Sequence, residues 1–307
     1  MKIKVFLIFI VVILLFLAGI NVWQGKTGNF LFSANISQPV ENLMPIKNLE
    51  TSDLVLEAKA VISVLIVKNS EEKILFEKNS REKLPIASLA KLMSADIVLE
   101  NLDLNKIVEI SKEAEAQQED IGNFKAGQSF FVKDLLFSSL IESSNDAIFA
   151  LSEILGQDTF VELMNLEAEN IALADSDFQN PTGLDLENKP SNFSTAEDLV
   201  KLTKHILEKS LIREIISLPD FDVYAADKVF HHKAVTTNQF LESSLFPAGY
   251  KIIGGKTGET PLADSSLILI FQNPKNQALL INVILGSGDR FGEMTKLIDW
   301  LNLAYQW

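Results

Sequence analysis

Five short apolar runs, rich in β-branched residues, stand towards the two ends of the globular part of the chain. Residues 61–67 and 74–76 flank a polar turn and predict a hairpin. Residues 250–256 predict a third strand, and residues 265–271 and 278–285 predict a second hairpin across another polar turn. The predicted strands thus form two groups along the sequence, two near the start of the globular part and three near its end.

Between these two groups of strands the apolar residues recur at helical spacing. Residues 88–100 predict one helix, and most of residues 101–210 favours further helices. The expected helix N-caps in this part are Asp134, Asn145 or Asp146, and Ser194. A last amphipathic helix carries Phe291, Met294, Leu297, Ile298 and Leu301. This order predicts an α+β fold, in which an antiparallel five-stranded sheet is covered by helices and carries an inserted all-helical lobe.

The N-terminus has a different pattern. Lys2 and Lys4 precede an uncharged apolar run over residues 5–20, which with its flank reaches the lower limit of about 17 residues for a membrane-spanning helix. We expect residues 1–23 to be an uncleaved membrane anchor or a cleaved signal peptide, and the basic flank places the rest of the chain outside the cytoplasm. Residues 24–54 predict a linker, and residues 55–307 a single globular domain.

Composition narrows the possible chemistry. The formal net charge of −14 argues against a nucleic-acid partner, because phosphate backbones are bound by clustered Lys and Arg. The chain has no cysteine, which excludes thiol nucleophiles, cysteine-ligated zinc and disulfides. Its three arginines are Arg81, Arg213 and Arg290, so a bidentate carboxylate contact must come from a short list.

A first candidate for chemistry is the pair Ser88 and Lys91. Residues three apart on a helix share a face, so an amine lies within reach of a hydroxyl. Lys91 is the one charged residue between Lys83 and Asp96. Burial of an unpaired ammonium favours the neutral amine, which can take the proton of a serine. The alternative is a surface lysine whose stem covers apolar neighbours.

A second candidate is the run Ser143, Ser144 and Asn145, at the break between two predicted helices. Side chains at such a break can project into a cleft. The alternative is ordinary helix capping, for which serine and asparagine are both suited.

A third candidate is Lys256, Thr257 and Gly258, at the end of a predicted strand and directly after two glycines. Glycines there allow a ligand to approach the backbone closely. The alternatives are a simple turn or a phosphate-binding loop. The latter is excluded because Tyr250 occupies the position of its first glycine.

Together the three motifs match, in order and context, the S-x-x-K, S-x-N and K-T-G motifs of β-lactamases and penicillin-binding proteins. Residues 178–184 and 194–199 extend the similarity. Across roughly residues 55–303 the chain resembles the D-alanyl-D-alanine carboxypeptidases, which are low-molecular-mass penicillin-binding proteins with a serine β-lactamase-like fold.

This resemblance implies roles for the catalytic residues. Ser88 would attack the D-Ala-D-Ala peptide bond and release the terminal D-alanine, with Lys91 as general base. Ser143 and Lys256 would pass the proton to the leaving amine. Asn145 would orient Lys91 and hold the substrate amide. Water would then hydrolyse the acyl-enzyme.

The resemblance also implies the binding residues. Lys256 and Thr257 would bind the substrate carboxylate, and Arg290 is a possible second contact for it. Gly258 would also be part of the substrate-binding site. The backbone N–H groups of Ser88 and Glu259 would form the oxyanion hole. No cofactor and no metal are implied. The implied partners are peptidoglycan stem peptides, β-lactams as covalent inhibitors, and the extracytoplasmic face of a bacterial membrane through the N-terminal segment.

Two residues depart from the usual pattern. Ser144 stands where the family usually has glycine, and Glu259 stands where it usually has an aromatic residue or histidine. An acidic side chain at position 259 could repel a carboxylate substrate.

Other functions remain as alternatives. A peptidoglycan D,D-endopeptidase would use the same residues. A catalytically inactive wall-binding scaffold is a second alternative, although the motifs are intact. A class A β-lactamase would need a glutamate in the region that here reads Phe178, Gln179, Asn180 and Pro181. A Ser-His-Asp triad and a metal pair at His231 and His232 lack the expected surrounding motifs.

Overall fold

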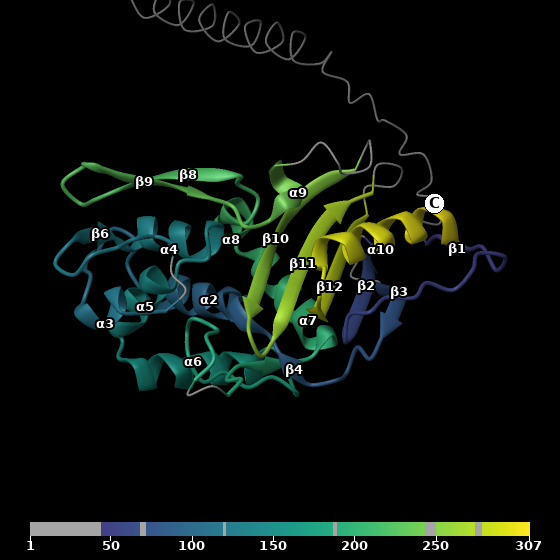
Figure 1. Cartoon of the computed structure of the whole chain (residues 1–307), viewed down its shortest axis with the longest axis horizontal. Helices are drawn as coiled ribbons and strands as arrows, with labels where there is room; N and C mark the ends of the chain where they lie inside the picture. Colours follow the sequence, from purple (N-terminus) through teal and green to yellow (C-terminus); the bar gives the residue numbers. More distant parts are fainter. Residues whose placement is uncertain (1–43, 68–71, 119–120, 187–188, 243–249, 274–277) are drawn as a thin grey trace, which may run out of the picture. The chain divides into compact units, whose positions relative to one another are not determined.

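The computed structural model describes residues 44–67, 72–118, 121–186, 189–242, 250–273 and 278–307, which belong to one compact unit beginning at Met44 (Figure 1). The predicted anchor or signal segment at residues 1–23, and most of the predicted linker, lie outside the described residues. Within the described ranges, no helix combines the length and the apolar character needed to cross a lipid bilayer.

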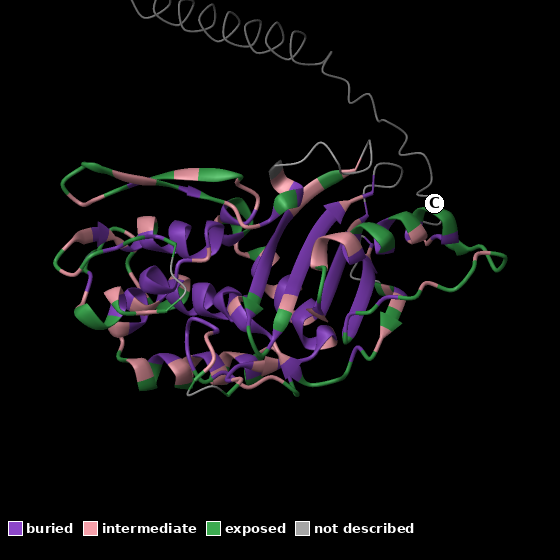
Figure 2. Ribbon diagram, in the orientation of Figure 1, coloured by how far each residue is buried: buried purple, intermediate pink, exposed green. Residues whose placement is uncertain are grey.

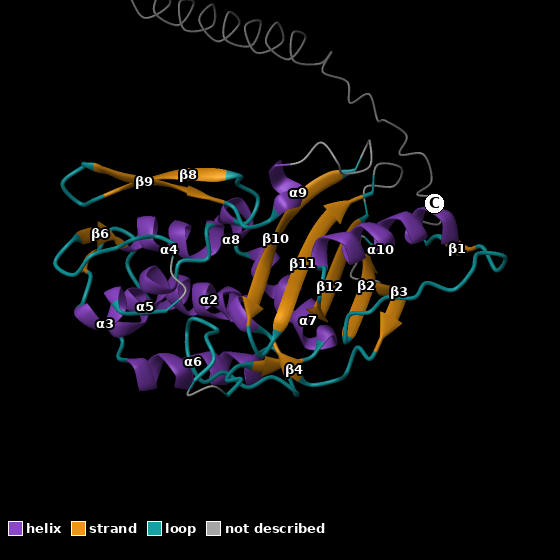
Figure 3. Cartoon of the chain, viewed as in Figure 1, coloured by secondary structure: helices purple, strands orange, loops and turns teal. Residues whose placement is uncertain are grey.

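A five-stranded antiparallel sheet forms the centre of this unit, which confirms the predicted fold class (Figure 3). The strand order is β10 (Lys251–Thr260), β11 (Asp264–Gln272), β12 (Leu279–Ser287), β2 (Ala60–Ile66) and β3 (Glu72–Lys78). Both predicted hairpins are present, as β2 with β3 and β11 with β12. Pairing of β12 with β2 joins the early and late strands into one sheet.

Helices cover both faces of the sheet, which explains why its central strands are apolar without alternation (Figure 2). Ile62 and Val64 of β2 belong to the core that α7 (Ala196–Glu208) also enters. Successive side chains of a strand point to opposite faces, so the equally buried Val61 and Leu65 face the side covered by α10 (Arg290–Ala304).

The inserted helical lobe lies between β3 and β10 in the sequence. It contains a 3₁₀ turn, η1 (Ala87–Ala90), followed by α2 (Lys91–Asn101), α3 (Lys112–Glu115), α4 (Val132–Ile141), α5 (Asn145–Glu153), α6 (Gln157–Asn170), α7 and α8 (Ser210–Ile215). Helix α2 is buried all round and contacts α4, α5, α6 and α7. The segment that carries the first motif is therefore held by neighbours on several sides.

The predicted helix caps are corrected by the structure. Helix α4 begins after Phe131, with Asp134 inside its first turn. Helix α5 is capped by Ser144, whose hydroxyl accepts from the Ala147 amide at 3.1 Å, rather than by Asn145 or Asp146. Helix α7 is likewise capped by Thr195, one residue after the predicted cap. In α5 and α7 the cap is the residue whose side-chain oxygen reaches the amide three positions further on, whereas Phe131 makes no side-chain cap to α4.

Several short pairings were not predicted. They are β4 (Leu84–Pro85) with β7 (Phe193–Ser194), β5 (Ile107–Glu109) with β6 (Ser129–Phe131), β8 (Asp220–Tyr224) with β9 (Phe230–Val235), and β1 (Ile46–Lys47) with β13 (Tyr305–Gln306). A helix α9 (Gln239–Glu242) precedes β10. Strand β1 lies in the stretch that the sequence assigned to the linker, and it packs against the chain's last residues.

Candidate active site

Ser88 lies in the 3₁₀ turn η1, and Lys91 is the first residue of α2. The predicted helix at this point thus begins with a tighter turn than expected. The preceding residue, Ala87, has a φ of 48°, in the left-handed region that non-glycine residues seldom adopt. Ser88 Oγ lies 2.8 Å from Lys91 Nζ, so the turn presents the hydroxyl directly to the amine.

The amine of Lys91 is fully buried and surrounded by oxygen atoms. It lies 2.6 Å from Asn145 Oδ1 and donates to the carbonyl oxygen of Thr182 at 2.7 Å. With Ser88 Oγ this makes three oxygen atoms around one nitrogen. These contacts hold Lys91 in one orientation through the first motif, the second motif and the 178–184 segment.

The second motif turns sharply between α4 and α5. Ser143 has a φ of 68°, another left-handed non-glycine conformation. Strained residues of this kind cluster at functional sites. Asn145 opens α5 and donates through Nδ2 to the carbonyl oxygen of Gln118 at 2.8 Å, so its amide is held from both ends. Ser144, the first departure from the family pattern, serves as the helix cap.

The third motif lies inside β10 rather than at its end, because the strand continues to Thr260. Lys256 Nζ donates to Ser143 Oγ at 2.8 Å and to the carbonyl oxygen of Thr257 at 3.0 Å. Burial lowers the pKa of Lys256 well below 10.5, and the nearby cations Lys91 and Arg290 lower it further. This lysine can therefore release a proton more readily than an exposed one.

The three motifs meet at one cavity of about 190 Å³. Its lining residues are Ser88, Ile121, Ser143, Asn145, Leu184, Thr237, Thr257, Gly258, Glu259 and Arg290. The structure thus brings together the eight site residues that the sequence predicted. Six of them line the cavity, and the amines of Lys91 and Lys256 reach its serine hydroxyls from buried positions.

Two glycines allow the strand and a loop to pack against the turn that carries Ser88. A Cβ atom at Gly258 would lie 2.9 Å from the carbonyl oxygen of Ile86 and 3.1 Å from the Ser88 nitrogen. A Cβ atom at Gly183, whose φ is 87°, would lie 2.1 Å from the carbonyl oxygen of Ala87. Any side chain at either position would push the turn out of place.

Glu259, the second departure from the family pattern, is paired with a cation. Its Oε2 accepts from Arg290 Nη1 at 2.8 Å, and the same Nη1 donates to the carbonyl oxygen of Gly258 at 3.1 Å. The predicted second carboxylate contact, Arg290, therefore lines the cavity but already binds a carboxylate of this chain.

Sequence reasoning missed three contributors to this site. The Thr182 carbonyl and the close packing of Gly183 come from a segment that was recognised only as part of the resemblance. Thr237 lines the cavity and its hydroxyl hydrogen-bonds that of Thr257. The sequence feature that could have predicted the first two was the run Pro181, Thr182 and Gly183. No sequence feature pointed to Thr237.

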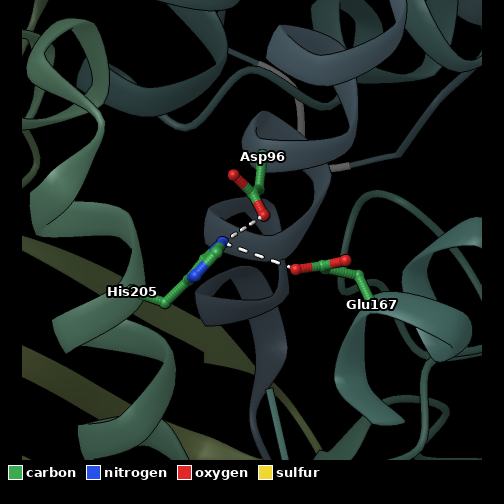
Figure 4. A group of neighbouring side chains, drawn as sticks. All are labelled: Asp96, Glu167 and His205. Atoms are coloured by element: carbon green, nitrogen blue, oxygen red, sulfur yellow. Dashed lines mark hydrogen bonds and ion pairs between the residues drawn. The ribbon is translucent and has the colours of Figure 1, made fainter. Parts of the chain in front are cut away.

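A second cluster of titratable side chains lies among three helices (Figure 4). Asp96 of α2, Glu167 of α6 and His205 of α7 each offer a potential metal-ligand atom within 4.8 Å of the others. His205 Nε2 lies 2.8 Å from the fully buried Asp96 and 3.6 Å from Glu167. Lys209 Nζ lies 3.5 Å from the other Asp96 oxygen, so a lysine of the chain itself provides a positive charge beside this buried carboxylate. The cluster links α2, α6 and α7.

The comparisons with known proteins agree with this geometry. The family model for D-alanyl-D-alanine carboxypeptidase matches residues 47–289. The chain belongs to this family. It is 30% identical over 267 residues to the D-alanyl-D-alanine carboxypeptidase DacF of Bacillus subtilis, covering 83% of this chain and 65% of that protein. Less than two thirds of the Bacillus relative is therefore matched.

Two further similarities are informative. The chain is 28% identical over 251 residues to a D-alanyl-D-alanine endopeptidase of Pseudomonas aeruginosa, covering 78% of this chain and 76% of that one. It also superposes on penicillin-binding protein D2 of Listeria monocytogenes, solved in its cefotaxime-bound form, with a TM-score of 0.68 and 28% identity, over 82% of this chain and 99% of that one.

Proposed function

We propose that the chain is a serine-type D-alanyl-D-alanine carboxypeptidase, which removes the terminal D-alanine from peptidoglycan stem peptides through an acyl-enzyme on Ser88. The observation that carries this proposal is the 2.8 Å separation of Ser88 Oγ from the buried amine of Lys91, at a cavity that all three motifs reach. A hydroxyl paired with a buried amine is the arrangement of an activated nucleophile. Membership of the family favours the same reaction.

The first half of the proposed reaction forms the acyl-enzyme. Ser88 Oγ attacks the carbonyl carbon between the two D-alanines while its proton passes to Lys91 Nζ. The oxyanion that develops is stabilised by the backbone N–H groups of Ser88 and Glu259, and one such donor is worth about 3 kcal/mol. Asn145 keeps Lys91 aimed at the hydroxyl, from a distance of 2.6 Å.

The leaving amine needs a proton, and the pair Ser143 and Lys256 is placed to supply it. Their 2.8 Å hydrogen bond connects a cavity-lining hydroxyl to a lysine whose pKa is lowered by burial. The proton that Lys91 took from Ser88 passes to this pair and replaces the one given to the leaving amine, so Lys91 is neutral again when D-alanine departs. Lys91 then takes a proton from the attacking water and returns it to Ser88 Oγ as the ester is hydrolysed. The enzyme returns to its starting state without a cofactor.

The terminal carboxylate of the substrate is assigned to the side of the cavity that β10 forms. There the hydroxyls of Thr237 and Thr257 and the guanidinium of Arg290 offer donors, with the charge of Lys256 behind them. The rest of the peptide is assigned to a second cavity of about 590 Å³, which shares Leu184 with the first and is lined by Gln117 and Gln118. A stem peptide needs such an extended site.

A D,D-endopeptidase that cuts peptidoglycan cross-links is the second candidate. The specific observation in its favour is the similarity to the Pseudomonas protein of that name over 78% of this chain. It would use the same nucleophile and the same proton relay. An inactive wall-binding scaffold and a β-lactamase rank below both, since the intact relay argues against the former and the missing glutamate against the latter.

The proposed place of action is the extracytoplasmic face of a bacterial membrane. The basic residues Lys2 and Lys4 and the apolar run after them support an N-terminal anchor, or a signal peptide if the segment is cleaved. β-Lactams are the proposed covalent inhibitors, because a cefotaxime-bound structure is known for the Listeria relative.

A fluorescent penicillin tests the nucleophile. The wild type should be labelled covalently, and Ser88→Ala should not. Ser210→Ala, which removes an exposed hydroxyl at the start of α8, is the matched control and should label like the wild type. Labelling that survives in Ser88→Ala would remove Ser88 from its proposed role.

A second measurement separates the two candidate functions. Release of D-alanine from a D-Ala-D-Ala pentapeptide is compared with cleavage of cross-linked muropeptides under the same conditions. Faster release of D-alanine supports the carboxypeptidase. Faster cleavage of cross-links supports the endopeptidase, and turnover of neither substrate by a protein that binds peptidoglycan supports the scaffold.

A further inference from the structure

Arg290 occupies a position that helix stability does not explain. It is the first residue of α10, where the helix dipole presents its positive end and disfavours a cation. Its side chain is only 15% exposed, so it is not simply solvated. Its Nε atom is buried and has no hydrogen-bond partner among the described residues. The guanidinium therefore has donor capacity left over in the wall of the cavity.

Glu259 is the carboxylate that now engages this guanidinium. Its side chain is 63% exposed, in contrast to that of Arg290, so it can turn towards solvent without leaving a buried charge. Glu259 follows Gly258 directly in β10, and its side chain lies at the boundary between the catalytic cavity and a neighbouring cavity of about 570 Å³. It can release Arg290 by a rotation of its own side chain.

A substrate carboxylate and the Glu259 carboxylate would accept hydrogen bonds from the same donors, the N–H groups of Arg290. Each is an anion that accepts hydrogen bonds from a guanidinium, and Arg290 Nη1 already donates to both Glu259 and the Gly258 carbonyl. A substrate whose leaving group ends in a free carboxylate therefore has to compete with Glu259 for Arg290. A leaving group without that charge need not.

We propose that Glu259 is a specificity-determining residue that competes with the substrate's terminal carboxylate for Arg290. It thereby reduces the advantage that the site gives to leaving groups carrying a free carboxylate. This inference rests on the proposed peptidase function, and it names the feature of the substrate on which selectivity depends. It also gives the departure of Glu259 from the family pattern a physical role.

The test compares two peptides that differ only at their C-terminus: one ends in D-Ala-D-Ala with a free carboxylate, the other in the corresponding carboxamide. The readout is the ratio of their kcat/KM values. In Glu259→Gln the ratio should rise about two- to fivefold, the effect expected from loss of one exposed ionic competitor. The change should arise from the free acid, with the carboxamide nearly unaffected.

Two further variants make the test specific. Asp264→Asn removes one negative charge from the wall of the neighbouring cavity, where Asp264 is paired with Lys59 at 2.8 Å, and should leave the ratio unchanged. In an Arg290→Met background the Glu259→Gln gain should disappear, because no guanidinium remains to be released. A gain that persists there, or an equal gain in Asp264→Asn, means general charge repulsion and overturns the proposal.

Failure of the specificity proposal is distinguishable from failure of the proposed function. If wild type and Glu259→Gln both label with penicillin and hydrolyse the peptides at the same ratio, only the role of Glu259 is wrong. If neither peptide is cleaved and penicillin does not label the wild type, the peptidase function is wrong and the specificity proposal is rejected with it.

Discussion

The amine of Lys256 lies 2.8 Å from the hydroxyl of Ser143, and this hydrogen bond joins the central sheet to the helical lobe inside the site. Lys256 comes from β10 and Ser143 from the link between α4 and α5. The contact spans 113 residues of sequence. It forms only in the folded chain, and its donor is a buried amine.

That amine should make the stability of the protein depend on pH. The pKa of Lys256 lies well below 10.5 in the folded protein, because of burial and of Lys91 and Arg290, whereas the unfolded chain keeps its proton up to 10.5. Between the two values the unfolded state binds more protons, so the free energy of unfolding contributed by this group rises with pH. At pH values below the pKa of Lys256 in the folded protein, the amine is charged in both states, and the cost of burying that charge lowers the free energy of unfolding in full.

Lys256→Met should therefore lose this contribution. In urea unfolding at a series of pH values, the free energy of unfolding of the wild type relative to that of Lys256→Met should increase as pH rises towards 10.5. Lys251→Met, at the exposed start of the same strand, is the control and should follow the wild type. Parallel curves for wild type and Lys256→Met would contradict the assignment.

Ser143 should show two separable effects. Ser143→Ala and Ser143→Gly both remove the hydroxyl that Lys256 contacts, so both should slow acylation by penicillin. Because the φ of Ser143 is 68°, the glycine variant should be more stable than the alanine variant by about 1 kcal/mol. Denaturant unfolding measures the difference, and an alanine variant of equal or greater stability would show that the backbone there is unstrained.

Gly183→Ala should disable the nucleophile by displacing its backbone. The new Cβ would meet the Ala87 carbonyl oxygen at 2.1 Å and displace the turn that holds Ser88, which should lower the acylation rate constant by about a hundredfold. Gly127→Ala is the matched control, because its φ of 86° imposes the same strain while nothing lies within 4 Å of the new Cβ. Equal acylation rates for the two variants would rule out the packing argument.

His205→Ala should weaken the fold rather than the chemistry. Asp96 is fully buried, and its Oδ2 would lose the ring nitrogen that lies 2.8 Å away, which should lower the free energy of unfolding by about 1–3 kcal/mol. Glu208→Ala, on the exposed side of α7, should change it by less than about 0.5 kcal/mol. The idea fails if denaturation midpoints of the two variants coincide.

The sheet could be predicted because its central strands β2, β11 and β12 are largely apolar and buried and because polar turns separate the paired strands. The hairpin of β8 and β9 could not, since Val223 and Ala234 are its only buried residues and the others read as an exposed loop. Its strands are held by backbone pairing, by the ion pairs of Lys233 with Asp220 and Asp222, and by contacts such as that of Phe221 with Phe137, which form only in the folded chain. None of these can be read from a local hydrophobic pattern.

The residues of the site could be predicted because their chemistry and order are distinctive. Their partners could not, for two physical reasons. The oxygen that Thr182 offers to Lys91 is a backbone carbonyl, which every residue possesses. Thr237 and the pair of Asp96 with His205 acquire their neighbours only through tertiary packing, the latter across 109 residues. Local sequence contains no trace of such contacts.

The pairing of β1 with β13 brings the first described residues beside the last. Ile46 is opposite Gln306, and Lys47 is opposite Tyr305. A short linker from Trp307 to Met44 could therefore close the compact unit into a ring. New ends opened at an exposed turn such as that between β8 and β9 would give a circular permutant whose catalytic cavity is unchanged and to which another protein could be fused at that turn.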